Sequence, residues 1–305
     1  MRISTSQIYD TGSRNLMSSQ ASLYKIQNQL STGKKFLSAQ DDPVAAAQVL
    51  ITSQSLAVNT QYADNQANAM SQLSYEESQL QAVVETLQQA RELAVSAGNG
   101  SYTDEERAKI ADAVDSKFEL LLGLANSTDA NGYYLFSGYK GSTRPFETAA
   151  DGSIYYNGDS GQRLLQVGST RQIAVSDSGN DIFLKGQDIF ASLQNLADTL
   201  RTDTSGDPVA AAAVQATVTA ELGNIDEALQ NVVMIRSKVG SRMNEVESLQ
   251  GISSSLDLQF QARISDLQDI DYAEAISRYI QQNTQLEAAQ SSFATISGLS
   301  LFKYL

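Results

Sequence analysis

The chain has 305 residues, and its 21 basic and 35 acidic side chains give a formal net charge of −14. It contains no cysteine, no histidine and no tryptophan. This composition disfavours nucleic-acid binding, which needs a basic face, and it excludes disulfides, thiolate chemistry and histidine-based catalysis or metal ligation. We therefore expect no enzyme activity, no catalytic residue, no cofactor and no metal site.

The first predicted helix runs from about residue 5 to residue 32 and carries a narrow apolar stripe. Its members recur every seven residues, with one intermediate position, which is the period of a seam between paired helices. A surface helix on a globular core is the alternative, but the polar remainder of the segment favours a partner helix. The stripe consists of Tyr9, Leu16, Leu23, Ile26 and Leu30.

A joint between two helices follows in residues 33–47, which read GKKFLSAQDDPVAAA. Gly33 can adopt the left-handed conformation that ends a helix. Asp42 can accept from the first N–H groups of the next helix, and Pro43 fits its first position, where no donor is needed. We expect this inter-domain joint of Gly33, Asp42 and Pro43 to let the two helices belong to different layers.

The second predicted helix runs from Pro43 to about Ala97, and its length is typical of a rod-like protein. Leu73, Leu80, Leu87 and Ala94 form its heptad stripe. A third helix starts at a capping box of Thr103 and Glu106 and ends near Asn126.

Residues 132–186 differ in kind, since they contain nine of the 19 glycines and seven aromatic residues between Tyr133 and Tyr156. Short β-branched segments alternate there with Gly and Asp turns, which predicts a small β-rich domain. We interpret the aromatic residues mainly as its core and leave a ligand platform as the alternative.

Helices return over residues 187–201, from Pro208 onward, and from about Leu267 to the end. Residues 1–40 carry five basic side chains against one acidic, and residues 266–305 carry five acidic against two basic, so the two ends are opposite in charge. The apolar positions that we expect on the last segment, as its part of an assembly interface, are Ile276, Ile280, Leu286, Phe293, Ile296, Leu301 and Phe302.

The predicted fold is mainly α with a small inserted β domain, because the two ends of the chain form long antiparallel helices around a β-rich middle. We expect three nested domains. They are a terminal-helix domain (1–42 and 266–305), a long-helix domain (43–131 and 187–265) and a β-rich outer domain (132–186).

Several segments resemble the flagellin superfamily of bacterial flagellar proteins. The joint LSTGKKFLSAQDDPVAAAQ is similar to the N-terminal signature of that family. The middle segment NGYYLFSGYKGSTRPF and the end DLQDIDYAEAISRYIQQNTQLEAAQSSFATISGLSLFKYL are similar, more specifically, to its members at the hook–filament junction. The resemblance spans essentially the whole chain.

This resemblance implies a structural role in which copies of the chain form a ring between hook-filament junction protein 1 and flagellin. It also implies a cytoplasmic export chaperone, type III export without a cleaved signal peptide, and an extracellular place in the flagellum. No nucleic-acid or membrane partner is expected, since no apolar run approaches the ~18 residues of a membrane span.

Two alternatives stay open at this stage. A filament flagellin with a short outer domain would pack its ends in the same way but would polymerise indefinitely. A secreted coiled-coil adhesin would instead use residues 132–186 as its contact surface.

Overall fold

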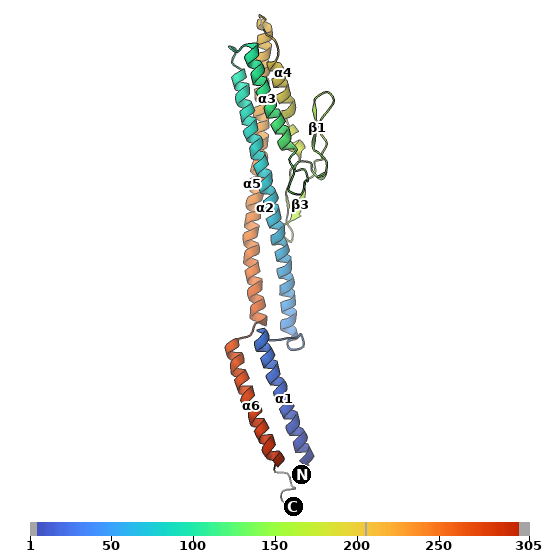
Figure 1. Cartoon of the computed structure of the whole chain (residues 1–305), viewed down its shortest axis with the longest axis vertical. Coiled ribbons are helices and arrows are strands. Elements are labelled where there is room, and N and C mark those ends of the chain that lie inside the picture. Colours follow the sequence, from blue (N-terminus) through green and yellow to red (C-terminus); the bar gives the residue numbers. More distant parts are fainter. Residues whose placement is uncertain (1–4, 205, 299–305) are drawn as a thin grey trace, which may run out of the picture. The chain divides into compact units, whose positions relative to one another are not determined.

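The protein is described by a computed structural model that covers residues 5–204 and 206–298 (Figure 1). Long helices predominate, and short strands lie in the middle of the sequence. In chain order the elements are α1 (Thr5–Thr32), α2 (Pro43–Ala97), α3 (Asp104–Ala125), β1 (Phe146–Thr148), β2 (Ile154–Tyr156), β3 (Leu164–Gln166), β4 (Gln172–Ala174), the π-helical turn η1 (Asn180–Leu184), α4 (Ile189–Leu200), α5 (Pro208–Gln268) and α6 (Tyr272–Gly298).

The chain divides into two compact units. One unit combines the residues up to 59 with those from 255 onward, and the other consists of residues 60–254. The predicted fold class is confirmed, because helices dominate and the described strands all lie within residues 132–186. The division into three nested domains stays a prediction.

In the unit of residues 60–254, α2 and α5 run side by side in opposite directions (Figure 1). Gln66 donates to Ser253 over 3.0 Å, Arg236 pairs with Glu77 at 2.5 Å, and Arg91 pairs with Asp226 at 2.5 Å. The partner numbers on α5 fall as the numbers on α2 rise, which defines the antiparallel register.

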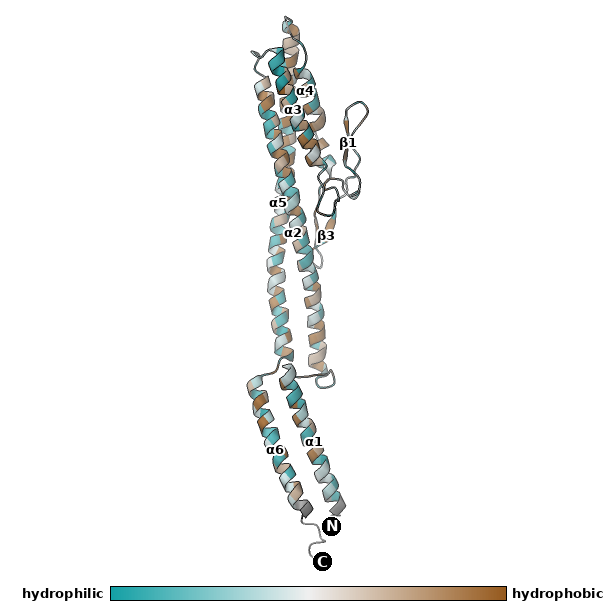
Figure 2. Cartoon of the chain, viewed as in Figure 1, coloured by the Kyte–Doolittle hydropathy of each residue, from teal (hydrophilic) through white to brown (hydrophobic). Residues whose placement is uncertain are grey.

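The apolar seam between these helices confirms the predicted heptad on α2. Leu73, Leu80, Leu87 and Ala94 are all fully buried. Figure 2 shows short apolar patches alternating with polar stretches along α2 and α5, as expected of helices that bury one stripe. The buried positions on α5 recur at three, four or seven residues and include Val214, Val218, Ile225, Val232, Val239 and Val246.

A second helix pair, α3 and α4, packs within the same unit. The predicted capping box at the start of α3 is present: Thr103 N–H donates to Glu106 Oε2 over 2.8 Å, and Glu106 N–H donates to Thr103 Oγ1 over 3.3 Å. Asp188 caps α4 in turn, since its Oδ1 accepts from the Phe190 N–H over 2.9 Å. Local hydrogen-bonding side chains therefore determine where both helices begin.

The middle of the chain forms two antiparallel hairpins, β1–β2 and β3–β4, around an aromatic core. Phe146 lies at its centre, with its ring centroid 5.2 Å from that of Tyr156, 5.3 Å from Phe183 and 5.1 Å from Phe190. The interpretation of the aromatics as core is thus confirmed for Phe136 and Phe146, which are fully buried. It is wrong for Tyr133, Tyr139 and Tyr155, which are 50%, 68% and 45% exposed. The turn η1 was not expected, because five residues are too few to show a helical period.

Side chains of α2 and α5 bind the backbone carbonyls of the second hairpin. Asn65 Nδ2 donates to Gln166 O and Gln66 Nε2 donates to Val167 O, over 2.8 and 2.7 Å. On the other strand, Arg242 Nη1 donates to Ala174 O over 2.9 Å. Two-stranded hairpins are marginal by themselves, so these contacts connect the β segment to its helical support.

A buried carboxyl group lies at the centre of this attachment. Glu76 of α2 is fully buried, and its Oε1 accepts from the Asp177 N–H over 2.9 Å. Asp177 itself forms an ion pair with Arg242 of α5 and accepts from Gln162 Nε2. Burial and the neighbouring Asp177 carboxylate raise the pKa of Glu76 to about 8, although Arg242 and Arg163 act in the opposite direction.

This shift makes the stability of the unit depend on pH. In the unfolded chain Glu76 ionises near its ordinary pKa of 4.5, whereas in the folded chain it stays neutral up to about 8. Unfolding therefore releases a proton between these two values. The contribution of Glu76 to the free energy of unfolding is largest below pH 4.5. It decreases as the pH rises from 4.5 to about 8.

We expect Glu76→Gln to raise the free energy of unfolding at pH 7 by roughly 2 to 3 kcal/mol, because a neutral amide keeps the acceptor for the Asp177 N–H and does not have to take up a proton on folding. Urea unfolding between pH 5 and 8.5 would measure the difference. Glu92→Gln, at an exposed position of the same helix, is the matched control. If the Glu76→Gln and native chains differed in the free energy of unfolding by the same amount at every pH, the raised pKa of Glu76 would be contradicted.

Candidate assembly surface

In the unit formed by the chain ends, α1 packs along α6. The predicted stripe on α1 forms the seam, and its five members are all half-buried. Tyr9 meets Phe293 of α6 edge to face, with ring centroids 5.7 Å apart. Gly12 allows this approach, because a Cβ there would lie 2.6 Å from the Phe293 ring. The α1 stripe therefore packs on a helix of the same chain, and its role in an interface between copies stays a prediction.

On α6 the positions predicted for an assembly interface divide between those that α1 covers and those that stay exposed. Leu286 is buried and Phe293 is half-buried against α1, but Ile276 and Ile280 are 48% and 59% exposed. The α6 residues that pack on α1 include alanines and polar residues as well as large apolar ones. A search for heptads of large aliphatic residues therefore does not find them. The positions covered on α6 are Ala275, Tyr279, Gln282, Asn283, Leu286, Ala289 and Phe293.

Large apolar side chains therefore stay uncovered on the outside of the terminal pair. Met17 and Tyr24 of α1 are 66% and 67% exposed, comparable with Ile276 and Ile280 of α6. The structure does not describe the side chain of Ile296, nor residues Leu301 and Phe302, so these predicted interface positions lie outside the described residues.

The same unit exposes a second apolar group that the sequence reasoning missed. Val44, Ile51 and Val58 recur at seven-residue intervals on the first turns of α2, and all are exposed. At the end of α5, Leu258 is 66% exposed. The seven-residue spacing of Val44, Ile51 and Val58 could have predicted this apolar face. The alanines beside Val44 were interpreted only as residues of high helix propensity at the start of α2.

The joint has the local conformation expected from its residues. Gly33 adopts a positive φ of 71°, and its N–H donates to Gln29 O over 2.9 Å at the end of α1. Asp42 Oδ1 accepts from the Ala45 N–H over 2.9 Å, and Pro43 is the first residue of α2. All three predicted joint residues therefore act within the described structure as helix-ending or helix-starting groups.

The joint also binds the returning chain, which the sequence did not reveal. Lys35 N–H donates to Gln268 O over 2.7 Å, and Ile270 N–H donates to Gly33 O over 2.8 Å. Asp271 then caps α6 by accepting from the Ala273 N–H. The final helix consequently begins at Tyr272 rather than near Leu267, since α5 continues to Gln268.

A surface ion pair orders the loop between the two helices. Lys25 Nζ lies 2.6 Å from Asp41 Oδ1, and Asp41 Oδ2 accepts from the N–H groups of Leu37 and Ser38. The Lys25 contact, followed by the two backbone donors, lowers the pKa of Asp41 to about 2. Because the carboxylate form is the one that is bonded, this loop keeps its contacts down to strongly acidic pH.

Within residues 5–204 and 206–298, no group of three or more metal-binding side chains comes together. In the same part of the chain, no helix has the length and hydropathy needed to cross a bilayer. The exposed apolar helix surfaces of the unit formed by the chain ends are the candidate functional feature.

Comparison with known proteins shows which family the chain belongs to. Family models for the bacterial flagellin N-terminal helical region and C-terminal helical region match residues 3–141 and 222–305. The flagellar hook-associated protein 3 of Salmonella typhimurium is 34% identical over 317 aligned positions, which cover 99% of each chain. This chain belongs to the hook-associated protein 3 family of the flagellins.

Solved structures agree with this assignment. A Vibrio parahaemolyticus structure assigned as a flagellar hook-associated protein is 26% identical, has a TM-score of 0.69, and covers 75% of this chain and 100% of its own. The flagellar junction protein FlgL of Legionella pneumophila shares the fold at 21% identity and a TM-score of 0.64, over 73% of this chain and 100% of its own. The chain is therefore a structural component of the flagellum.

For this family member, we expect Gly33→Ala to destabilise the joint by about 1 to 2 kcal/mol, because an L-residue is strained at positive φ. The new Cβ would also lie 3.0 Å from the Tyr272 hydroxyl. Hydrogen exchange of the Lys35 and Ile270 amides would report the loosening.

Gly223→Ala is the matched control, since Gly223 lies inside α5 with no atom within 4 Å of an added Cβ. This substitution should stabilise the helix by about 0.5 to 1 kcal/mol. Equal exchange rates at the joint in Gly33→Ala and the native chain would contradict the assigned role of Gly33.

Proposed function

We propose that copies of this chain form a ring that joins the hook side of the flagellum, ending in hook-filament junction protein 1, to the flagellin filament. The observation that carries the proposal is the uncovered apolar surface on the terminal helix pair, where Met17, Tyr24, Ile276 and Ile280 are each about half or more exposed. Several large apolar side chains exposed on one pair of helices indicate a candidate interaction site.

Burial of these side chains supplies the driving force for assembly. Each large apolar side chain contributes about 1.5 to 3 kcal/mol when it is fully removed from water. The seam between α1 and α6 already uses one face of each helix, so the remaining face is available to a neighbouring copy. Different surfaces that meet head to tail close into a ring when the rotation permits it.

The exposed group on the first turns of α2 and the end of α5 extends this contact surface. Val44, Ile51 and Val58 lie on one face of α2, because seven residues make two helical turns. Neighbouring copies that cover this face as well would contact both the terminal helices and the beginning of the long helices.

We also propose the role of each predicted domain. The terminal helices (1–42 and 266–305) form an inner tube, the long helices (43–131 and 187–265) form the surrounding wall, and residues 132–186 form the outer domain. The joint with Gly33, Asp42 and Pro43 connects tube to wall, and its bonds to Gln268 and Ile270 tie the outgoing and returning chain together.

Export by the type III route fits the composition. A chain that passes unfolded through a narrow channel cannot be closed by disulfides, and this sequence contains no cysteine. A cytoplasmic chaperone would cover the exposed apolar helix faces before export, and assembly would take place outside the cell.

A seeded assembly assay followed by electron microscopy tests the proposal. Purified chain is added to hooks that end in hook-filament junction protein 1, with and without flagellin. We expect a short added zone of constant length, after which flagellin grows. Long filaments of this chain alone would contradict the junction role and identify a filament flagellin, and no addition to the seeds would contradict assembly at this position.

We expect Ile280→Ser to weaken addition to the seed about tenfold or more, since loss of one buried apolar contact costs at least about 1.4 kcal/mol. The melting temperature of the free chain should change little, because Ile280 is 59% exposed. Gln281→Ser, at the next exposed position, is the control for the added hydroxyl. Equal addition by the two variants would show that α6 does not use this face.

A further inference from the structure

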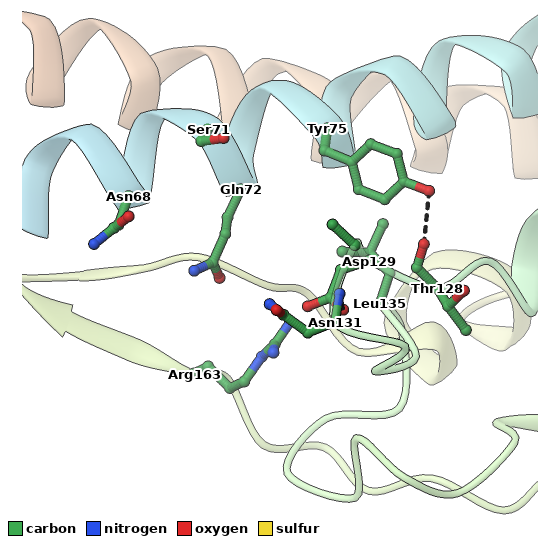
Figure 3. Close-up of a pocket in the computed structure, with 10 residues that line it drawn as sticks. Asn68, Ser71, Gln72, Tyr75, Thr128, Asp129, Asn131, Leu135 and Arg163 are labelled. Carbon is green, nitrogen blue, oxygen red and sulfur yellow. Dashed lines mark hydrogen bonds between the residues drawn. The ribbon is translucent and has the colours of Figure 1, made fainter.

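A pocket of about 550 Å³ opens between α2 and the loop that follows α3 (Figure 3). One wall comes from α2, with Asn68, Gln72 and Tyr75, and the opposite wall comes from Asn131 and Arg163. Figure 3 shows the side chains of Gln72, Asn131 and Arg163 pointing toward one another across it. All of these residues belong to the unit of residues 60–254.

Several polar side chains of this pocket form no hydrogen bond within the described part of the chain. Within residues 5–204 and 206–298, the side-chain amides of Asn68, Gln72 and Asn131 and the Ser71 hydroxyl form no hydrogen bond to another group. Asn68, Ser71 and Asn131 are exposed to solvent, and Gln72 is half-buried. Arg163 reaches Ser176 Oγ through Nε at 3.5 Å, which leaves its two terminal nitrogens open to the pocket. Convergent unused donors and acceptors in a cavity of ligand size indicate a binding site.

Neighbouring amides on the same helix show the contrast. Asn65 and Gln66 lie one turn earlier on α2, and both donate to carbonyls of the β3 segment. Their role is structural, because they satisfy backbone acceptors. Asn68 and Gln72 continue the run of amides toward the pocket but meet no backbone group.

The walls are held in place by bonds that do not use the pocket-facing groups. Tyr75 Oη donates to Thr128 O over 2.8 Å. Asp129 Oδ1 accepts from the N–H groups of Asn131 and Tyr133 over 2.8 and 2.9 Å, so the loop is fixed while Asp129 Oδ2 stays available. A site held in this way loses little conformational entropy when a ligand binds.

We propose that this pocket binds a saccharide. Hydroxyl groups both donate and accept, and side-chain amides match them because each amide supplies two donors and one acceptor oxygen. Asp129 Oδ2 can accept from two neighbouring sugar hydroxyls, and Arg163 can donate to hydroxyls or to a sugar carboxylate. Tyr75 adds a flat aromatic ring, which combines an apolar face with a polar edge.

The balance of charge decides between neutral and acidic sugars. Arg163 and Asp129 offset each other in net charge, so the pocket has no overall preference for an anion. A neutral sugar would bind chiefly through the amides and Asp129, whereas a sugar acid would place its carboxylate on the Arg163 guanidinium, whose planar fork fits two oxygens. Both belong to the same ligand class and are separated by the test.

Saturation-transfer NMR on the full chain tests the proposal, with glucose, galactose, N-acetylglucosamine, glucuronic acid and N-acetylneuraminic acid as probes. We expect at least one of them to bind, and Gln72→Ala and Asn131→Ala each to weaken that binding about tenfold, the effect of losing about 1.4 kcal/mol. Both variants should melt as the native chain does, because neither amide has a partner to lose.

Gln88→Ala removes an exposed amide from α2 outside the pocket and should bind the sugar unchanged. Arg163→Met should abolish binding of the sugar acids and spare the neutral sugars. The proposal is overturned if no probe binds, or if the pocket variants bind sugar as tightly as Gln88→Ala does. It is also overturned if the pocket variants change self-association of the chain and no sugar binds. The last result would assign the pocket to a protein partner.

Discussion

The apolar seam between α2 and α5 is the constraint on which the rest of residues 60–254 depends. Leu73, Leu80 and Leu87 are completely removed from water, and each contributes about 1.5 to 3 kcal/mol. The strands of the middle segment have three residues each and could not persist alone. They form because Asn65 and Gln66 of α2 and Arg242 of α5 donate hydrogen bonds to backbone carbonyls of the β3–β4 hairpin.

Successive turns of α2 serve different purposes on the face that carries the middle segment. Gln66 and Glu76 bind the β segment, and Glu76 does so at the cost of a buried carboxyl whose pKa is raised. Asn68 and Gln72, between them in sequence, leave their amides toward a pocket. A single helix thus supports the attached segment and lines a candidate binding site at successive turns, since Gln72 and Glu76 are four residues apart and lie on the same side of α2.

The terminal helix pair is built differently from this central seam. Its contact on α6 includes Ala275 and Gln282 as well as Leu286, so it buries less apolar surface than a seam of leucines. Ile276 and Ile280 stay in water on the adjoining face. This combination of a modest internal seam and exposed large side chains suits helices whose stability is completed by neighbouring copies.

Much of this protein was readable from its sequence. The helix limits at Gly33, Asp42–Pro43 and Thr103, the heptads of α1 and α2 and the β-rich range of residues 132–186 follow from local chemistry and periodicity. The family was indicated by the resemblance of whole segments to known flagellar proteins. The sequence did not identify which residues of α6 pack on α1, because a pattern of large aliphatic residues does not distinguish a face covered by the same chain from a face that another copy could cover.

Only the tertiary structure decided which distant residues meet. It paired Gly33 with Ile270 at the joint, placed Asp177 against Glu76, and gathered Asn131 and Arg163 opposite Gln72. None of these contacts has a sequence signal, since the partners are separated by 59 or more positions along the chain, or by a loop without periodic structure. Periodicity reports which side of a helix is apolar, whereas the identity of the surface that covers it depends on how the whole chain packs.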